Sequence, residues 1–126
     1  MSLKEYFEGS KGFGALATAS ADGSVDVAVY ARPHVVDEET VAFIMADRLS
    51  HRNLQSNTHA AYLFREDAAG YAGKRLHLTK VKEETDAEGI QALRRRKTPI
   101  ACEPEEGEAR YLVTFHVERV RPLVGD

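Results

Sequence analysis

The chain has 126 residues, of which 43% are hydrophobic and 29% are charged, and its net charge is −3. This length suits one domain, residues 1–126, and is too short for two, while the composition excludes a disordered chain. The acidic balance argues against a nucleic-acid-binding protein, and the single cysteine excludes an intrachain disulfide.

The first half of the chain alternates between helix signals, glycine breaks and strand patterns. Ser2 and Glu5 have the spacing of a capping box, ahead of an apolar stripe. A tight turn at 21–23 joins a strand of small residues to a strand that Pro33 interrupts. We therefore expect a helix over residues 2–9, a strand over 13–20, a strand with Val25, Val27 and Val29 on one face, a turn at 37–39 and a strand over 40–46.

The second half predicts two more helices and three more strands. Asp47 stands where the N-cap of a short helix belongs, and Thr85 with Glu88 forms a second capping box. The expected elements are a helix over 48–55, strands over 59–64, 75–83 and 110–121, a glycine-containing loop over 67–74, a helix from Thr85 to Lys97 and an acidic connection over 98–108.

Strands at this spacing, joined mostly by hairpins, are typical of an antiparallel barrel. The three short helices would flank or plug that barrel. The sequence thus predicts a mainly β protein, a β-barrel with short helices.

The segment from Thr40 to Leu54 carries the clearest chemical signal, because a buried strand leads directly into a helix. The first turn of a helix offers unpaired N–H groups and the positive end of the helix dipole. Arg48, Ser50 and Arg52 add a hydroxyl and two guanidinium groups at that point. This combination suits a phosphate group. The same pattern also fits a basic, solvated surface helix with an ordinary cap.

Residues 43–64 resemble the FMN-binding split-barrel family typified by pyridoxamine 5′-phosphate oxidase. Members carry a strand, a polar and basic helical turn, the sequence N-L-x-x-N-P and an apolar strand. Here residues 53–58 read NLQSNT, and residues 17–23 resemble the family's A-T-x-x-x-D-G first hairpin. The resemblance covers about residues 10–125. It implies a homodimer that holds FMN at its interface and buries one barrel face.

The resemblance also implies which residues bind the cofactor. Ser50 takes the place of a phosphate-binding lysine or hydroxyl. Leu49 stands where the oxidases have arginine, so Arg48 or Arg52 would supply that charge. Arg75 falls where the oxidases have a flavin-contacting glutamine and would come from the partner subunit. The expected FMN site comprises Tyr30, Arg32, Phe43, Ile44, Met45, Arg48, Ser50, Arg52, Asn53 and Arg75.

The function implied is a small FMN-dependent oxidoreductase that passes a hydride or electrons between the flavin and a small donor or acceptor. The sequence lacks the aromatic and arginine residues that follow the last strand of the oxidases, so oxidation of pyridoxamine phosphate is not expected. No residue stands out as a general acid or base. The alternatives are a non-catalytic flavin-binding or electron-carrier module and a haem-binding split-barrel protein.

Other chemical groups carry weaker signals. The five histidines show neither i, i+4 pairing on a helix nor a cysteine partner, so no metal site is expected. The basic run 94–97 would close a helix, where cations complement the dipole, and Cys102 lies in an acidic segment that disfavours its thiolate. No apolar stretch approaches the ~20 residues of a membrane helix, and we expect a cytoplasmic protein without a membrane partner.

Overall fold

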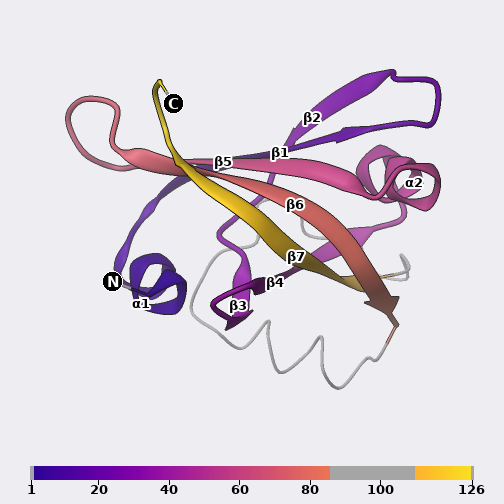
Figure 1. Cartoon of the computed structure of the whole chain (residues 1–126), viewed down its shortest axis with the longest axis horizontal. Coiled ribbons are helices and arrows are strands. Elements are labelled where there is room, and N and C mark those ends of the chain that lie inside the picture. Colours follow the sequence, from indigo (N-terminus) through magenta and orange to yellow (C-terminus); the bar gives the residue numbers. More distant parts are fainter. Residues whose placement is uncertain (1, 86–109, 126) are drawn as a thin grey trace.

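A computed structural model describes residues 2–85 and 110–125 of the chain (Figure 1). Its helices are α1 (Leu3–Gly9) and α2 (Leu49–Ser56); its strands are β1 (Gly12–Ala19), β2 (Val25–Val29), β3 (His34–Asp37), β4 (Thr40–Ala46), β5 (His59–Glu66), β6 (Gly73–Glu84) and β7 (Arg110–Pro122). The predicted helix beyond Thr85, the basic run within it, the connection over 98–108 and Cys102 lie outside the described residues. No helix in the described part of the chain is long and apolar enough to cross a membrane.

The strands form one antiparallel sheet in the order β2-β1-β5-β6-β7-β4-β3. The consecutive strands β1–β2, β3–β4, β5–β6 and β6–β7 pair with each other, whereas β5 pairs with β1 and β7 joins β6 to β4. Figure 1 shows that α1 and α2 lie at opposite ends of this curved sheet. The mainly β class with short helices is confirmed. The sequence did not separate β3, because Pro33 hid the start of a new strand that pairs with β4.

Alternate residues of each strand fill the core on the inner side of the sheet. The Phe43 ring lies 5.0 Å from the Tyr62 ring and 5.9 Å from the Phe115 ring, measured between centroids. Burial of one such side chain contributes about 1.5–3 kcal/mol. The largest fully buried side chains include Phe7, Leu16, Val41, Met45, Leu54, Tyr62, Phe64, Leu76, Leu78, Val113 and Phe115.

Helix α1 closes one end of this core, and its cap is the predicted capping box. The Ser2 hydroxyl oxygen accepts the Glu5 N–H at 3.1 Å, and the same hydroxyl donates to the Glu5 carboxylate at 3.0 Å. Phe7 is 1% exposed and packs edge-on against Phe64, with ring centroids 5.4 Å apart. The capping signal and the apolar stripe therefore place this helix as the sequence predicted.

The valines of β2 share one face, as predicted, but that face points away from the core. Val25, Val27 and Val29 are 81%, 67% and 40% exposed. Pairing of β2 with β1, and of β1 with β5, places exposed Phe13 and Leu63 on the same side of the sheet. We call this side the apolar outer face; it consists of Phe13, Ala15, Ala17, Val25, Val27, Val29, Ala61 and Leu63.

Candidate functional site

The start of α2 lies three residues after the buried strand β4. Its N-cap is Arg48 and not Asp47, and no side chain caps the helix. The predicted cap is wrong because the Asp47 carboxylate instead lies 3.0 Å from Nδ1 of His51, one helical turn ahead. The first N–H groups of α2 are therefore left without a side-chain acceptor, as at helix ends that bind anions.

Three of the predicted phosphate-binding residues gather at this helix start. Ser50 is 4% exposed, whereas Arg48 and Arg52 are exposed. Arg52 lies within the helix, whereas Arg48, as the N-cap, has an extended backbone just before it. Asn53 is buried, and its amide nitrogen donates to the Thr18 hydroxyl at 3.0 Å. This hydrogen bond holds α2 against β1, so Asn53 helps to position the helix.

The residues expected beside the flavin ring lie mostly inside the core. Tyr30, Phe43 and Met45 are 8%, 4% and 0% exposed, and the Tyr30 ring packs edge-on against Phe43 at 5.9 Å. Ile44 is half-buried, and its side chain alternates to the other side of β4. Of these four, Ile44 alone offers a ligand appreciable surface; the other three support β4 from within.

Two predicted arginines are held at other places in the fold. The Arg32 guanidinium donates to the carbonyl groups of Phe7 and Ser10 at the end of α1, which lies at the opposite end of the sheet from α2 (Figure 1). The Arg75 guanidinium donates to the Pro122 carbonyl at 2.8 Å and also to the Gly125 carbonyl. Within one chain, therefore, Arg32 and Arg75 are not part of the group at the start of α2.

A polar cluster that the sequence did not predict connects α2 to the sheet. His51 is 5% exposed; its Nδ1 lies 3.0 Å from the Asp47 carboxylate, and its Nε2 lies 3.0 Å from that of Glu83. Each ring nitrogen of His51 therefore faces a carboxylate acceptor, and the Gln55 amide nitrogen lies 3.2 Å from Nε2. The His51 ring also stacks on Tyr111, with centroids 4.0 Å apart and planes at 13°.

Glu83 completes this arrangement, which we call the His51 cluster: Asp47, His51, Gln55, Lys80, Glu83 and Tyr111. The Glu83 carboxylate also accepts from Lys80 at 2.5 Å and from Gln55 at 2.8 Å. Burial raises the pKa of Glu83, but the hydrogen bonds from Lys80, Gln55 and His51 outweigh burial and lower that pKa to about 2. The i, i+4 spacing of Asp47 and His51 was the one signal of this cluster in the sequence. Glu83 is 32 residues from His51, so no local pattern indicated their contact.

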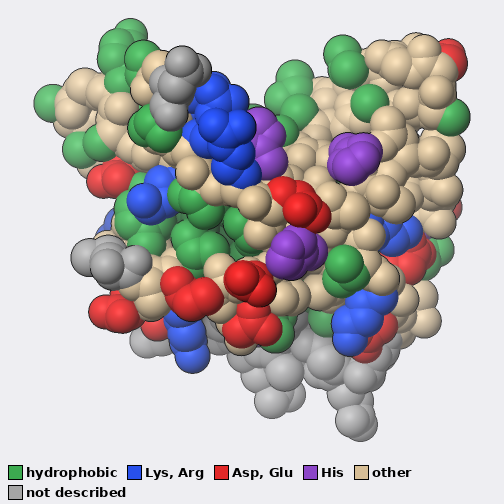
Figure 2. All heavy atoms as spheres, viewed as in Figure 1, with side chains coloured by type: hydrophobic (Ala, Val, Ile, Leu, Met, Phe, Trp, Pro, Cys, Tyr) green, Lys and Arg blue, Asp and Glu red, His purple; other side chains and the backbone are tan. Residues whose placement is uncertain are grey.

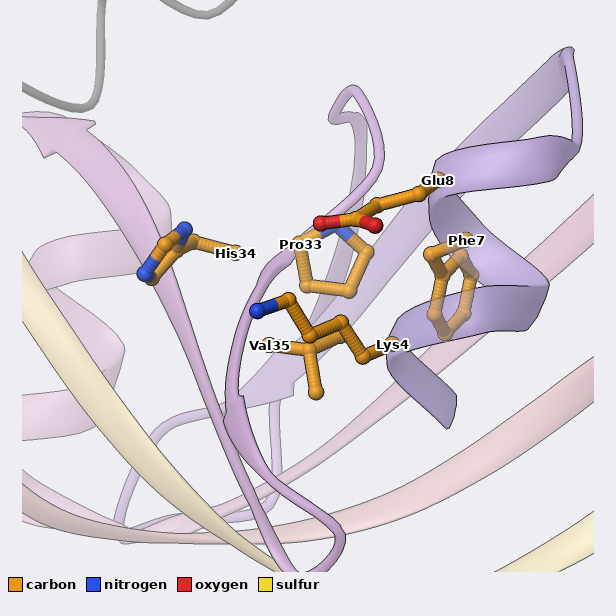
Figure 3. A pocket seen from close by; sticks show the side chains of 6 residues that line it. All are labelled: Lys4, Phe7, Glu8, Pro33, His34 and Val35. Atoms are coloured by element: carbon orange, nitrogen blue, oxygen red, sulfur yellow. The ribbon is translucent and has the colours of Figure 1, made fainter. Parts of the chain in front are cut away.

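Two further observations concern alternative sites. Within residues 2–85 and 110–125, no group of three or more histidine, cysteine, aspartate or glutamate side chains could hold a metal ion. A pocket of about 100 Å³ lies between α1 and the start of β3, where Lys4 and Glu8 extend toward Pro33 (Figure 3). Its volume is well below the roughly 300 Å³ at which ligand pockets begin, so it does not suit a flavin.

Comparison with known proteins identifies the fold. No protein-family model and no curated protein matches the sequence. Among solved structures, the chain is similar to an FMN-binding protein from Syntrophomonas wolfei subsp. wolfei, with a TM-score of 0.72 and 13% identity over 98% of this chain and 84% of the other.

The chain is also similar to an F420 reductase, with a TM-score of 0.70 and 18% identity over 96% of this chain and 98% of that one. A candidate pyridoxamine 5′-phosphate oxidase from Lactobacillus delbrueckii gives a TM-score of 0.69 and 17% identity, over 96% and 92% of the two chains. At these identities the likeness establishes the fold: the chain is a split barrel, as the sequence predicted.

Proposed function

We propose that this protein is a homodimeric flavoprotein that binds FMN and passes a hydride or electrons through it. The observation that carries the proposal is the start of α2, where no side chain caps the helix and exposed Arg48, buried Ser50 and exposed Arg52 follow shortly after buried β4. Solved proteins with the same fold include an FMN-binding protein and an F420 reductase, which supports a flavin-type ligand.

The phosphate group would lie at the start of α2. There the helix dipole and the first N–H groups attract an anion, and the exposed guanidinium groups of Arg48 and Arg52 add charge-assisted hydrogen bonds. Ser50 would supply its hydroxyl from the buried side of the turn. The His51 cluster and the Asn53–Thr18 hydrogen bond hold α2 against β6 and β1, so the turn is fixed before the ligand arrives.

The flavin ring would lie along β4. When bound, the flavin supplies the hydride or electron chemistry, and the protein sets its orientation and surroundings. Ile44 would give the ring an apolar surface, while Tyr30, Phe43 and Met45 fix the position of the strand from the core side.

The apolar outer face supports the homodimer. Val25, Val27, Phe13 and Leu63 are large apolar side chains with exposed fractions of 81%, 67%, 53% and 39%, and strand register places them on one side of the sheet. Contiguous apolar surface of this kind is unusual on a monomer and is typical of an interface. A second copy of this chain would cover it.

The test of the cofactor is a titration of the purified protein with FMN, followed by visible absorption and flavin fluorescence. We expect saturation at one FMN per chain with quenched fluorescence. A protein that shows no saturable change with FMN would contradict the proposal. Turnover with reduced nicotinamide and an electron acceptor then separates an oxidoreductase from an electron carrier, because a carrier shows almost none.

A further inference from the structure

A row of basic residues lies on the outer side of β6 and β7, apart from the start of α2. Arg75 stands directly opposite Arg121, and His77 directly opposite Arg119. Residues directly opposite in an antiparallel pair point to the same side, with Cβ atoms roughly 4.5–5.5 Å apart. These four residues therefore form one group, which we call the β6–β7 basic cluster.

The charges of this cluster repel one another in the folded chain. Like charges directly opposite each other destabilise a sheet. In the described part of the chain, Arg75 donates to the carbonyl groups of Pro122 and Gly125, and neither it nor Arg119 forms an ion pair with a carboxylate. Glu118 is next to Arg119 in sequence, but its carboxylate lies 3.9 Å from Nε2 of His116. A bound anion would offset this repulsion.

His77 gives a second and independent indication. Its Nε2 is buried and has no hydrogen-bond partner among the described residues. Burial, followed by the charges of Arg121, Arg119 and Arg75, lowers the pKa of the His77 imidazole. Leaving a buried polar atom without a partner costs free energy, so such atoms in native proteins usually mark a bound water, ion or ligand.

The position of the cluster defines what kind of molecule would fit. Strand register continues the row of Arg75 through Leu63, Ala15 and Val29, so the cluster borders the apolar outer face. Figure 2 shows Lys and Arg side chains beside a histidine near the C-terminal end of β7, on one wall of a hollow whose other wall is the β1–β2 hairpin. An anionic group attached to an apolar or aromatic body matches this border.

We propose that Arg75, His77 and Arg119 form a second anion-binding site, which takes the phosphate or carboxylate group of an organic molecule. Arg119 is exposed and can turn toward the anion, and Arg75 supplies a guanidinium group from the neighbouring strand. His77 lies opposite Arg119, and its Nε2 forms a hydrogen bond with the same bound anion. The anion site itself does not depend on the proposed function. Identification of the bound molecule as the electron donor or acceptor of the flavin does rest on that function.

The test is an NMR titration of the flavin-free protein with inorganic phosphate and, separately, with acetate, observed at the imidazole signals of His77. We expect a saturable shift, and a rise in the pKa of His77 when the anion is bound. The comparison of phosphate with acetate distinguishes the two anion chemistries. Arg119→Gln should raise the dissociation constant about tenfold, since it removes a charge-assisted contact.

The matched control is Lys82→Gln, which removes one positive charge from an exposed side chain of β6, the strand that carries Arg75 and His77. It should leave the dissociation constant within about twofold of the unmodified protein. A linear, unsaturable shift, or equal effects of Arg119→Gln and Lys82→Gln, would overturn the proposal. Thermal unfolding confirms that both variants remain folded.

FMN separates this inference from the proposed function. If one equivalent of FMN leaves the phosphate response of His77 intact, the second site stands beside the flavin site. If FMN abolishes that response, the cluster holds the FMN phosphate and a second site is refuted. A protein that binds phosphate at His77 but never binds FMN would keep the anion site and refute the flavoprotein.

Discussion

Replacement of Glu83 tests the His51 cluster, which holds α2 in place. Glu83→Gln keeps the shape of the side chain but removes the charge that accepts hydrogen bonds from His51, Gln55 and Lys80. Without screening by solvent, the lowering of the Glu83 pKa from 4.5 to about 2 would contribute about 3 kcal/mol to the free energy of unfolding. Because the side chain is 25% exposed, we expect a loss of about 2 kcal/mol.

The pH dependence gives this prediction its sign. A carboxyl group whose pKa is lowered by folding stabilises the protein at pH values above its unfolded pKa, and that contribution is lost as the pH falls through the folded pKa. The difference between the unmodified protein and Glu83→Gln should therefore be full at pH 7. It should shrink between pH 4.5 and about 2, the interval set by the two pKa values.

Urea unfolding followed by circular dichroism at several pH values measures this difference. The control is Glu84→Gln, which removes an exposed carboxylate that pairs with exposed Lys82 and should cost about 0.5 kcal/mol or less. A loss for Glu83→Gln that matches the control at pH 7, or one that does not change with pH, would refute the account of the cluster.

Two more substitutions test the core and the proposed interface. A Cβ at Gly14 would lie 1.9 Å from the Tyr62 hydroxyl oxygen, so Gly14→Ala should cost about 1–3 kcal/mol in thermal or urea unfolding, whereas Gly9→Ala, with no atom within 4 Å of the new Cβ, should be near neutral. Equal stability of the two variants would contradict the close approach at Gly14. Val27→Asp should convert the proposed dimer into monomers in sedimentation analysis, and Val36→Asp, at another exposed valine, should not; a monomeric unmodified protein would refute the interface.

Local signals predicted those elements whose formation depends on neighbouring residues. The capping box at Ser2 fixed the start of α1, because its hydrogen bonds join residues only three apart. The cap of α2 was predicted one residue early. Asp47 has the chemistry of a cap, but His51 competes for its carboxylate once Glu83 fixes the other side of the ring.

Long-range pairing decided the features that the sequence left open. Alternation showed that Val25, Val27 and Val29 share a face, but only the position of β2 in the sheet determines that the face is the outer one. Arg75 and Arg119 are far apart in sequence and come together only through the register of β6 and β7. Local residue types located the start of α2, and the resemblance singled out Arg75, but neither indicated the β6–β7 basic cluster as a group.

The most direct test of the central claim compares FMN with riboflavin, which lacks the phosphate, in binding to the unmodified protein and to the double variant Arg48→Ala with Ser50→Ala. Loss of charge-assisted phosphate contacts costs about 1.5–3 kcal/mol, which weakens FMN binding roughly 10- to 150-fold. We predict this loss for FMN, with riboflavin affinity within about twofold of the unmodified protein. If both ligands weaken equally, or neither does, the phosphate does not lie at the start of α2.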